Sequence, residues 1–317
     1  MKILVIAIAA LLAGSTPVQG KVKMSGYLTS GLKGDPDGES FYKVRLKFKS
    51  KRVDGIRAVA AIDGESDDDH LGMKDAYIDI KEGAGRILIG QAKKRFGLEY
   101  EEGKKERLTV RRSPLYQKLE EFSFVGREGG VRYISGDADK DLSYWRAGLG
   151  YNETQDASLL LSFSRSLEPA SRWFVFGLIQ DDRIHEDRQL VWALDGGYLW
   201  EAGLNRFVVE AMAGKDPVES EYEKTYGDGR AVLFSGIKIE LAMEWTARVQ
   251  PLLQLTHVAH DLDEVSAKSS TGLMGVNFWH SKALRLALNL ESTSHEGKVA
   301  GSKSRHDFGA FEALYLF

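Results

Sequence analysis

Basic side chains gather in one stretch of the sequence, residues 93–126, which contains nine Lys and Arg residues against six Asp and Glu residues. The whole chain carries a formal charge of -3, so the sign of the charge reverses locally. Lys and Arg that line a narrow aqueous passage stabilise anions, because low-dielectric walls focus their field, and Arg can hold a carboxylate or phosphate with two N–H groups. The stretch therefore predicts contact with small anionic solutes through Lys93, Lys94, Arg95, Lys104, Lys105, Arg107, Arg111 and Arg112.

A second set of basic residues occupies alternating positions. From Tyr42 to Lys49, apolar residues alternate with Lys and Arg, which is the period of a β-strand with two unlike faces. If the apolar faces meet lipid, the basic faces turn into an aqueous lumen, and this adds Lys43, Arg45, Lys47, Arg57 and Arg132 to the predicted pathway. Inward acids offset part of this charge. A non-selective diffusion pore therefore stays an alternative to an anion-preferring one, and cation preference is the least favoured.

Period-2 alternation continues along most of the chain and predicts an all-β protein. Many segments are about ten residues long, which suits tilted strands that cross a membrane. No convincing amphipathic helix follows residue 20. We predict about sixteen strands in a transmembrane antiparallel β-barrel, near residues 21–33, 39–50, 56–65, 73–82, 86–92, 127–135, 142–151, 157–166, 172–181, 189–200, 204–214, 230–242, 245–258, 269–279, 284–293 and 306–317.

The connections between these strands alternate in length. Tight turns such as 83–85 and 201–203 alternate with mostly longer segments, as short periplasmic turns and external loops do in outer-membrane barrels. Four Trp residues fall near the predicted periplasmic strand ends, as an aromatic girdle requires. Pro251 is an exception inside a predicted strand, so we expect either a bulge there or a misplaced strand.

The two ends of the chain predict export and membrane assembly. Residues 1–20 have the Lys2 charge, the apolar run and the small-residue end of a signal peptide, although a single membrane anchor is an alternative. Residues 21–317 then form one barrel domain. The last strand ends on Phe317. This strand is similar to the C-terminal signal that the barrel-assembly machinery recognises, although an ordinary hydrophobic last strand would have the same pattern. Contact with outer-membrane lipid and lipopolysaccharide follows from this location.

Composition excludes several classes of protein. Mean hydropathy is -0.29, and no runs of about 20 apolar residues indicate a helical membrane protein. An aromatic content of 10% argues against disorder, and the absence of Cys excludes disulfide scaffolds and thiolate sites. His257 and His260 lie near Ser266, Ser269 and Ser270, but no motif organises them. We predict no enzymatic activity, cofactor, metal or nucleic-acid partner, while a structural or partner-binding barrel stays an alternative.

Residues 73–99 resemble the phosphate-selective porin O/P family of bacterial outer membranes. The resemblance lies in the segment from Asp75 to Tyr77, a short turn, and the sequence from Ile89 to Glu99, followed by a long connection. It implies a homotrimer of sixteen-stranded barrels whose third extracellular loop folds inward to narrow the pore, and phosphate as a solute. Arg95 stands where the family often has another residue, so no phosphate-binding residues are carried over.

Overall fold

The computed structural model describes residues 22–34, 39–65, 68–102, 104, 106–121, 124–136, 143–151, 157–168, 170–184, 187–215, 233–260, 268–296 and 303–317. The predicted signal peptide, residues 1–20, lies outside these ranges, as do Lys105 and Ser266. No helix among the described residues is long and apolar enough to cross a membrane.

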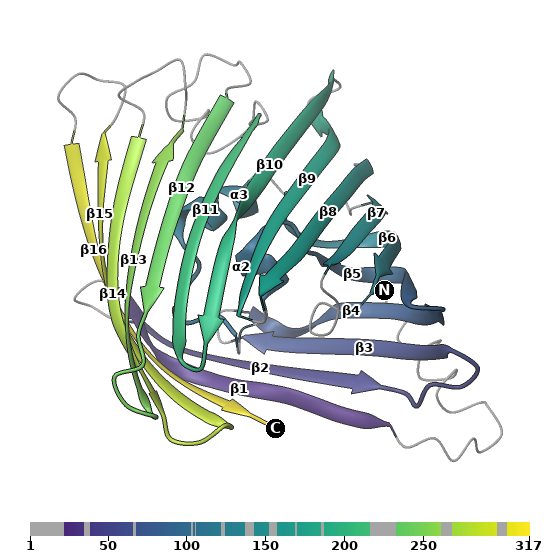
Figure 1. Ribbon diagram of the computed structural model, residues 1–317, viewed down its shortest axis with the longest axis horizontal. Helices are drawn as coiled ribbons and strands as arrows, with labels where there is room; N and C mark the ends of the chain where they lie inside the picture. The colour runs from purple at the N-terminus through teal and green to yellow at the C-terminus, as the bar shows by residue number, and fades with distance from the viewer. Residues whose placement is uncertain are drawn as a thin grey trace.

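The described residues form one closed antiparallel barrel of sixteen strands (Figure 1), which confirms the predicted fold class. Each strand pairs with its neighbour in sequence, and β1 closes the barrel against β16, with the Gly26 N–H donating to the Phe317 carbonyl at 2.9 Å. The strands are β1 (Lys23–Gly34), β2 (Glu39–Lys49), β3 (Ile56–Glu65), β4 (Asp68–Glu82), β5 (Gly85–Lys94), β6 (Gly126–Ser135), β7 (Ser143–Tyr151), β8 (Ala157–Glu168), β9 (Ser171–Ile184), β10 (Asp187–Ala202), β11 (Asn205–Lys215), β12 (Leu233–Ala242), β13 (Val249–Ala259), β14 (Lys268–Trp279), β15 (Leu284–Glu296) and β16 (Lys303–Leu316).

The barrel is apolar outside and polar inside. In β8, Leu161 and Phe163 are about half exposed, whereas Ser162 and Ser164 between them are buried. Glu210 and Glu312 are fully buried on the inner face of their strands. This reverses the usual arrangement of a water-soluble protein, in which charged side chains are exposed. An outer surface of this kind suits hydrocarbon and an inner one suits water.

Pro251 requires neither a bulge nor a different strand. It pairs with Val276 of β14 in unbroken register, and its carbonyl accepts from the Met243 N–H at 3.0 Å. A residue's N–H and C=O point to the same side of a strand, so the missing donor of Pro251 faces Met243, one residue beyond the end of β12. The proline therefore lies where the β12–β13 ladder is ending.

The expectation that no helix follows residue 20 was wrong. Between β5 and β6, the third loop (residues 95–125) contains α2 (Leu98–Glu101) and α3 (Pro114–Glu121). The Ser113 carbonyl accepts from the Gln117 N–H at 3.0 Å, and Pro114 holds the first helical position, where a proline costs no hydrogen bond. Eight residues span about two turns, which is too short for a helical period to stand out in the sequence.

Candidate functional site: the lumen and its third loop

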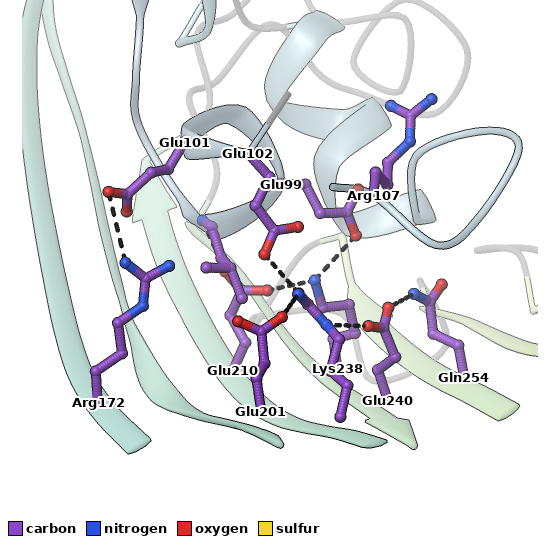
Figure 2. Close-up of polar contacts among 12 residues, drawn as sticks. Glu99, Glu101, Glu102, Arg107, Arg172, Glu201, Glu210, Lys238, Glu240 and Gln254 are labelled. Carbon is purple, nitrogen blue, oxygen red and sulfur yellow. Dashed lines mark hydrogen bonds and ion pairs between the residues drawn. The ribbon is translucent and has the colours of Figure 1, made fainter. Parts of the chain in front are cut away.

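The third loop lies against the inner face of the barrel and is docked there by charge. Three acidic residues of α2 and its C-cap point toward basic side chains of the wall (Figure 2). Glu99 is 2.9 Å from the Lys238 Nζ, and Glu102 is 2.6 Å from Arg206. Glu101 is 2.5 Å from Arg146. The acids of the loop therefore neutralise cations that strand alternation alone turns into the lumen.

The following part of the loop reverses these roles. Arg111 forms a two-bond ion pair with Glu291 of β15, and Lys104 pairs with Glu312 of β16. The Val110 N–H also donates to the Asn289 side chain at 2.6 Å. Here the loop supplies the cations and the wall supplies the acids, so the net charge of the loop is a poor guide to the charge that a solute meets.

Apolar contacts complete the docking. Leu115 and Leu119 of α3 belong to one buried cluster with Phe174 and Phe176 of β9 and Phe234 of β12. This burial holds the helix to the wall independently of charge.

The entry to α2 depends on a glycine. Gly97 has a φ of 77°, which favours glycine, and a Cβ there would collide with the Tyr116 hydroxyl. That hydroxyl donates to Glu210 of β11, and the Leu98 N–H of α2 donates to the same carboxylate at 3.2 Å, so the two helices share one contact with the wall. We name β9–β16, which make most of these contacts, the covered wall; Arg146, which pairs with Glu101, lies on β7.

A cavity of about 90 Å³ remains on the opposite side of the third loop, against strands between β2 and β8, which we name the open wall. Its lining includes Asp75, and Tyr77 and Leu88 add uncharged surface. Its basic side chains number six and are Lys47, Arg86, Lys93, Arg95, Arg132 and Arg146. Arg132 and Arg146 also pair with Glu128 and Glu101, which do not line the cavity, so the six cations are partly neutralised and the lining keeps an excess of positive charge.

Several cations of this cavity have unused hydrogen-bonding capacity. Arg132 and Arg146 are more than nine-tenths buried, yet Nε and Nη1 of each lack a partner among the described residues. Arg95 is exposed and forms no ion pair with any described residue. Lys93 donates to the Glu102 carbonyl at 3.1 Å and lies 5.0 Å from the Tyr100 ring centre. A buried guanidinium N–H without an acceptor is costly, so these groups favour an anion or water in the cavity.

The structure separates the other predicted pathway residues from this cavity. Lys94 is buried, with Gln180 at 2.9 Å and Glu128 at 3.2 Å. Arg107 donates to carbonyls of its own loop, and Arg112 pairs with Glu120 at 2.8 Å.

The strand residues of the predicted set have acidic partners. Lys43 and Arg45 share Asp63, and Arg57 pairs with Asp79. Lys47 lies 3.8 Å from Asp75, and Arg132 lies 3.2 Å from Glu128. Arg86 lines the cavity and Arg206 anchors the loop, but neither was among the candidates, although strand alternation places both on the inner face.

The His and Ser residues considered for catalysis form two separate pairs. His257 contacts the Ser270 hydroxyl at 2.9 Å on the outer face of the barrel. His260 contacts the Ser269 hydroxyl at 3.1 Å on the inner face. These are cross-strand contacts on opposite faces rather than one constellation, and the prediction of no enzymatic activity stays a prediction.

Comparisons with known proteins show the fold. No family model matches the sequence and no curated protein matches it, so the resemblance to the phosphate-selective porins stays a prediction. Among solved structures, the chain is similar to the trimer form of OmpT, an outer-membrane protein of Vibrio cholerae, with a TM-score of 0.69 and 12% identity over 94% of this chain and 99% of that one. It is also similar to the anion-selective porin of Comamonas acidovorans, with a TM-score of 0.64 and 12% identity over 94% of this chain and all of that one. The outer-membrane channel DcaP of Acinetobacter baumannii gives a TM-score of 0.66 and 12% identity over 95% of this chain and 99% of that one.

Proposed function

We propose that this protein is a bacterial outer-membrane porin, a water-filled diffusion channel that prefers small anions. The observation that carries the proposal is the cavity beside the third loop. Six basic side chains and one carboxylate line it, and Nε and Nη1 of two buried guanidinium groups lack a partner among the described residues. In a narrow passage with low-dielectric walls, such a charge excess lowers the energy of an anion and raises that of a cation.

Fold and surface polarity support the channel part of the proposal. A closed barrel with an apolar exterior has a place in a membrane, and the neighbours of similar fold include an anion-selective porin and an outer-membrane channel. The third loop fills the covered side of the lumen, so we place the solute path off the barrel axis, along the open wall. Arg95, Lys47 and Arg132 would be the residues that a passing anion meets.

The direct test is the reversal potential of the folded protein in a planar bilayer with a salt gradient. We expect stepwise conductance and a potential with the sign of anion selectivity. A cation-selective sign would overturn the preference but leave the channel. If protein that is shown to be folded never gives conductance steps, the channel itself is overturned. That result would favour a structural or partner-binding barrel.

Finer parts of the proposal need separate experiments. Phosphate as the solute predicts that low phosphate concentrations block chloride current, whereas general anion flow predicts no block.

A homotrimer predicts an oligomer that resists SDS and dissociates on heating; the V. cholerae structure of similar fold is described as a trimer. If residues 1–20 direct export and are removed, the mature protein in purified outer membranes should begin near Lys21. In that membrane we expect the protein to contact lipopolysaccharide.

Recognition of Phe317 by the barrel-assembly machinery is a further part of the proposal. The Phe317 N–H and carbonyl both bond to Gly26 of β1, so the terminal residue takes part in closing the barrel. Replacing Phe317 with Ala should reduce the amount of protein in the outer membrane while leaving synthesis unchanged. Equal amounts of the two proteins in the membrane would remove this residue from the signal.

A further inference from the structure

Three histidines face the lumen at the rim that carries the third loop. In β15 the side chains of alternate residues from Arg285 to Thr293 are buried, and His295 continues that face. In β16, His306 lies on the same face as the buried residues Ala310 and Glu312. His260 follows the buried face of β13 in the same way. The lumen entrance is therefore lined by imidazoles on three of four consecutive strands.

Two of these imidazoles are adjacent. His295 pairs in register with Ser304, and His306 pairs with Thr293, so the two histidines are diagonal neighbours across β15 and β16. Their ring centres are 5.6 Å apart, with an angle of 72° between the ring planes. Two imidazoles bound to one tetrahedral Zn²⁺, with Zn–N distances of about 2.0–2.1 Å, have ring centres about 5 Å apart. The observed spacing is close to that of a two-histidine chelate.

Both rings are available as ligands. No hydrogen bond reaches either ring within the described part of the chain, and His306 is exposed while His295 is half-buried. The next inward carboxylate along β15 belongs to Glu291, and Arg111 holds it, so it does not compete for the imidazoles. His260 is engaged with Ser269 of the intervening strand and is not part of the pair. Metal ions and small solutes can therefore reach the two rings from the lumen.

We propose that His295 and His306 bind a divalent transition-metal ion, such as Zn²⁺ or Cu²⁺, at the entrance of the lumen. Neutral imidazole nitrogen is a preferred ligand of both ions. Among the described residues no three potential ligands converge, so the chain supplies two ligands and the remaining positions are left to water or a small anion. The bound ion would add positive charge at the entrance, where an anion-preferring channel gains from it.

The test uses the folded barrel, prepared without an affinity tag. Titration with ZnCl2 measures Zn²⁺ binding, and electron paramagnetic resonance reports the ligands of bound Cu²⁺. We expect one Cu²⁺ site with hyperfine coupling to two nitrogens. His295→Ala and His306→Ala should each weaken Zn²⁺ binding by about tenfold or more, since the loss of second-shell groups alone often costs that much. His257→Ala and His260→Ala are the matched controls and should bind like the parent protein.

Two results would overturn the site: Zn²⁺ affinity unchanged in both His295→Ala and His306→Ala, or an equal loss in His260→Ala. Both proposed ligands lie at the rim, outside the buried clusters, so either variant serves if the other fails to fold. The binding assay does not depend on current. A failed metal site would therefore leave the proposed channel standing, and a channel without anion preference would leave the metal site standing.

Discussion

The covered wall and the open wall of the lumen are both rich in cations, yet they differ in what those cations contact. On the covered wall, Lys238 and Arg206 are buried against Glu99, Glu102, Glu210 and other acids that surround them (Figure 2). Beside the open wall, Arg95 of the third loop has no ion-pair partner among the described residues. On the open wall itself, Nε and Nη1 of Arg132 and Arg146 lack a partner among these residues.

This difference separates two uses of the same residue types. Cations on the covered wall hold the third loop in place, because removing one partner of a buried pair leaves an uncompensated charge. Cations on the open wall have capacity left for a mobile anion, although Arg146 there also pairs with Glu101 of the loop. A count of basic residues in the lumen merges the two groups, and only their partners distinguish a structural cation from one that a solute can meet.

The largest effect should follow from breaking the covered wall. Lys238→Met leaves Glu99 and Glu210 buried without their cation, which costs about 3–5 kcal/mol. We expect the third loop to leave the wall, single-channel conductance to rise and the loop to become sensitive to protease. Lys268→Met is the matched control, because its pair with Glu296 is partly exposed and contributes at most about 1 kcal/mol. If both variants conduct like the parent, Lys238 does not hold the loop.

A smaller effect should distinguish the walls by selectivity. Arg95→Gln and Arg111→Gln each remove one positive charge from the same loop. Arg95 lines the cavity of the open wall, whereas Arg111 is paired with Glu291 on the covered wall. We expect the anion-to-cation permeability ratio, measured from reversal potentials, to fall in Arg95→Gln and to change much less in Arg111→Gln. Equal changes in the two variants would mean that the solute path does not follow the open wall.

Acid should weaken the contact between the loop and the walls over a defined range of pH. Burial raises the pKa of the Glu101 carboxyl, but Arg146 and Arg172 outweigh burial and lower it from 4.5 to about 2. A depressed carboxyl pKa stabilises the docked loop above about pH 4.5, and this contribution is lost as the pH falls toward about 2. The part of the conductance response that depends on Glu101 should therefore be absent from neutral pH down to about 5 and appear below it. Glu101→Gln should lack this acid-dependent component, and an identical acid response in both proteins would assign it to another group.

The smallest effect tests a single hydrogen bond of α3. Tyr116→Phe removes the hydroxyl that donates to Glu210, and a bond of this kind contributes about 1–3 kcal/mol when its acceptor is charged. Thermal unfolding and protease sensitivity of the loop should shift modestly. Tyr198→Phe is the control, because Tyr198 packs against Trp173 on the outer face. A loop as stable in Tyr116→Phe as in the control would show that apolar packing alone holds α3.

Strand alternation is a local property, so the sequence by itself was enough to predict sixteen strands and the inward face of several basic residues. Lys47 and Arg132 point inward because their neighbours one residue away are apolar and must meet lipid. The same rule places Arg86 and Arg206 inward. The eight residues of α3 were missed because their packing against β9 and β12, rather than a long periodic pattern, holds them as a helix.

Which cations remain available to a solute was decided only by the tertiary structure. Glu99 and Lys238 are 139 residues apart, and Val110 and Asn289 are 179 residues apart, yet each pair is in contact. No local pattern specifies such partners, since they depend on how the third loop crosses the closed barrel. The sequence determined that the lumen is charged. The path of the third loop across the lumen determines which cations hold the loop and which face the water.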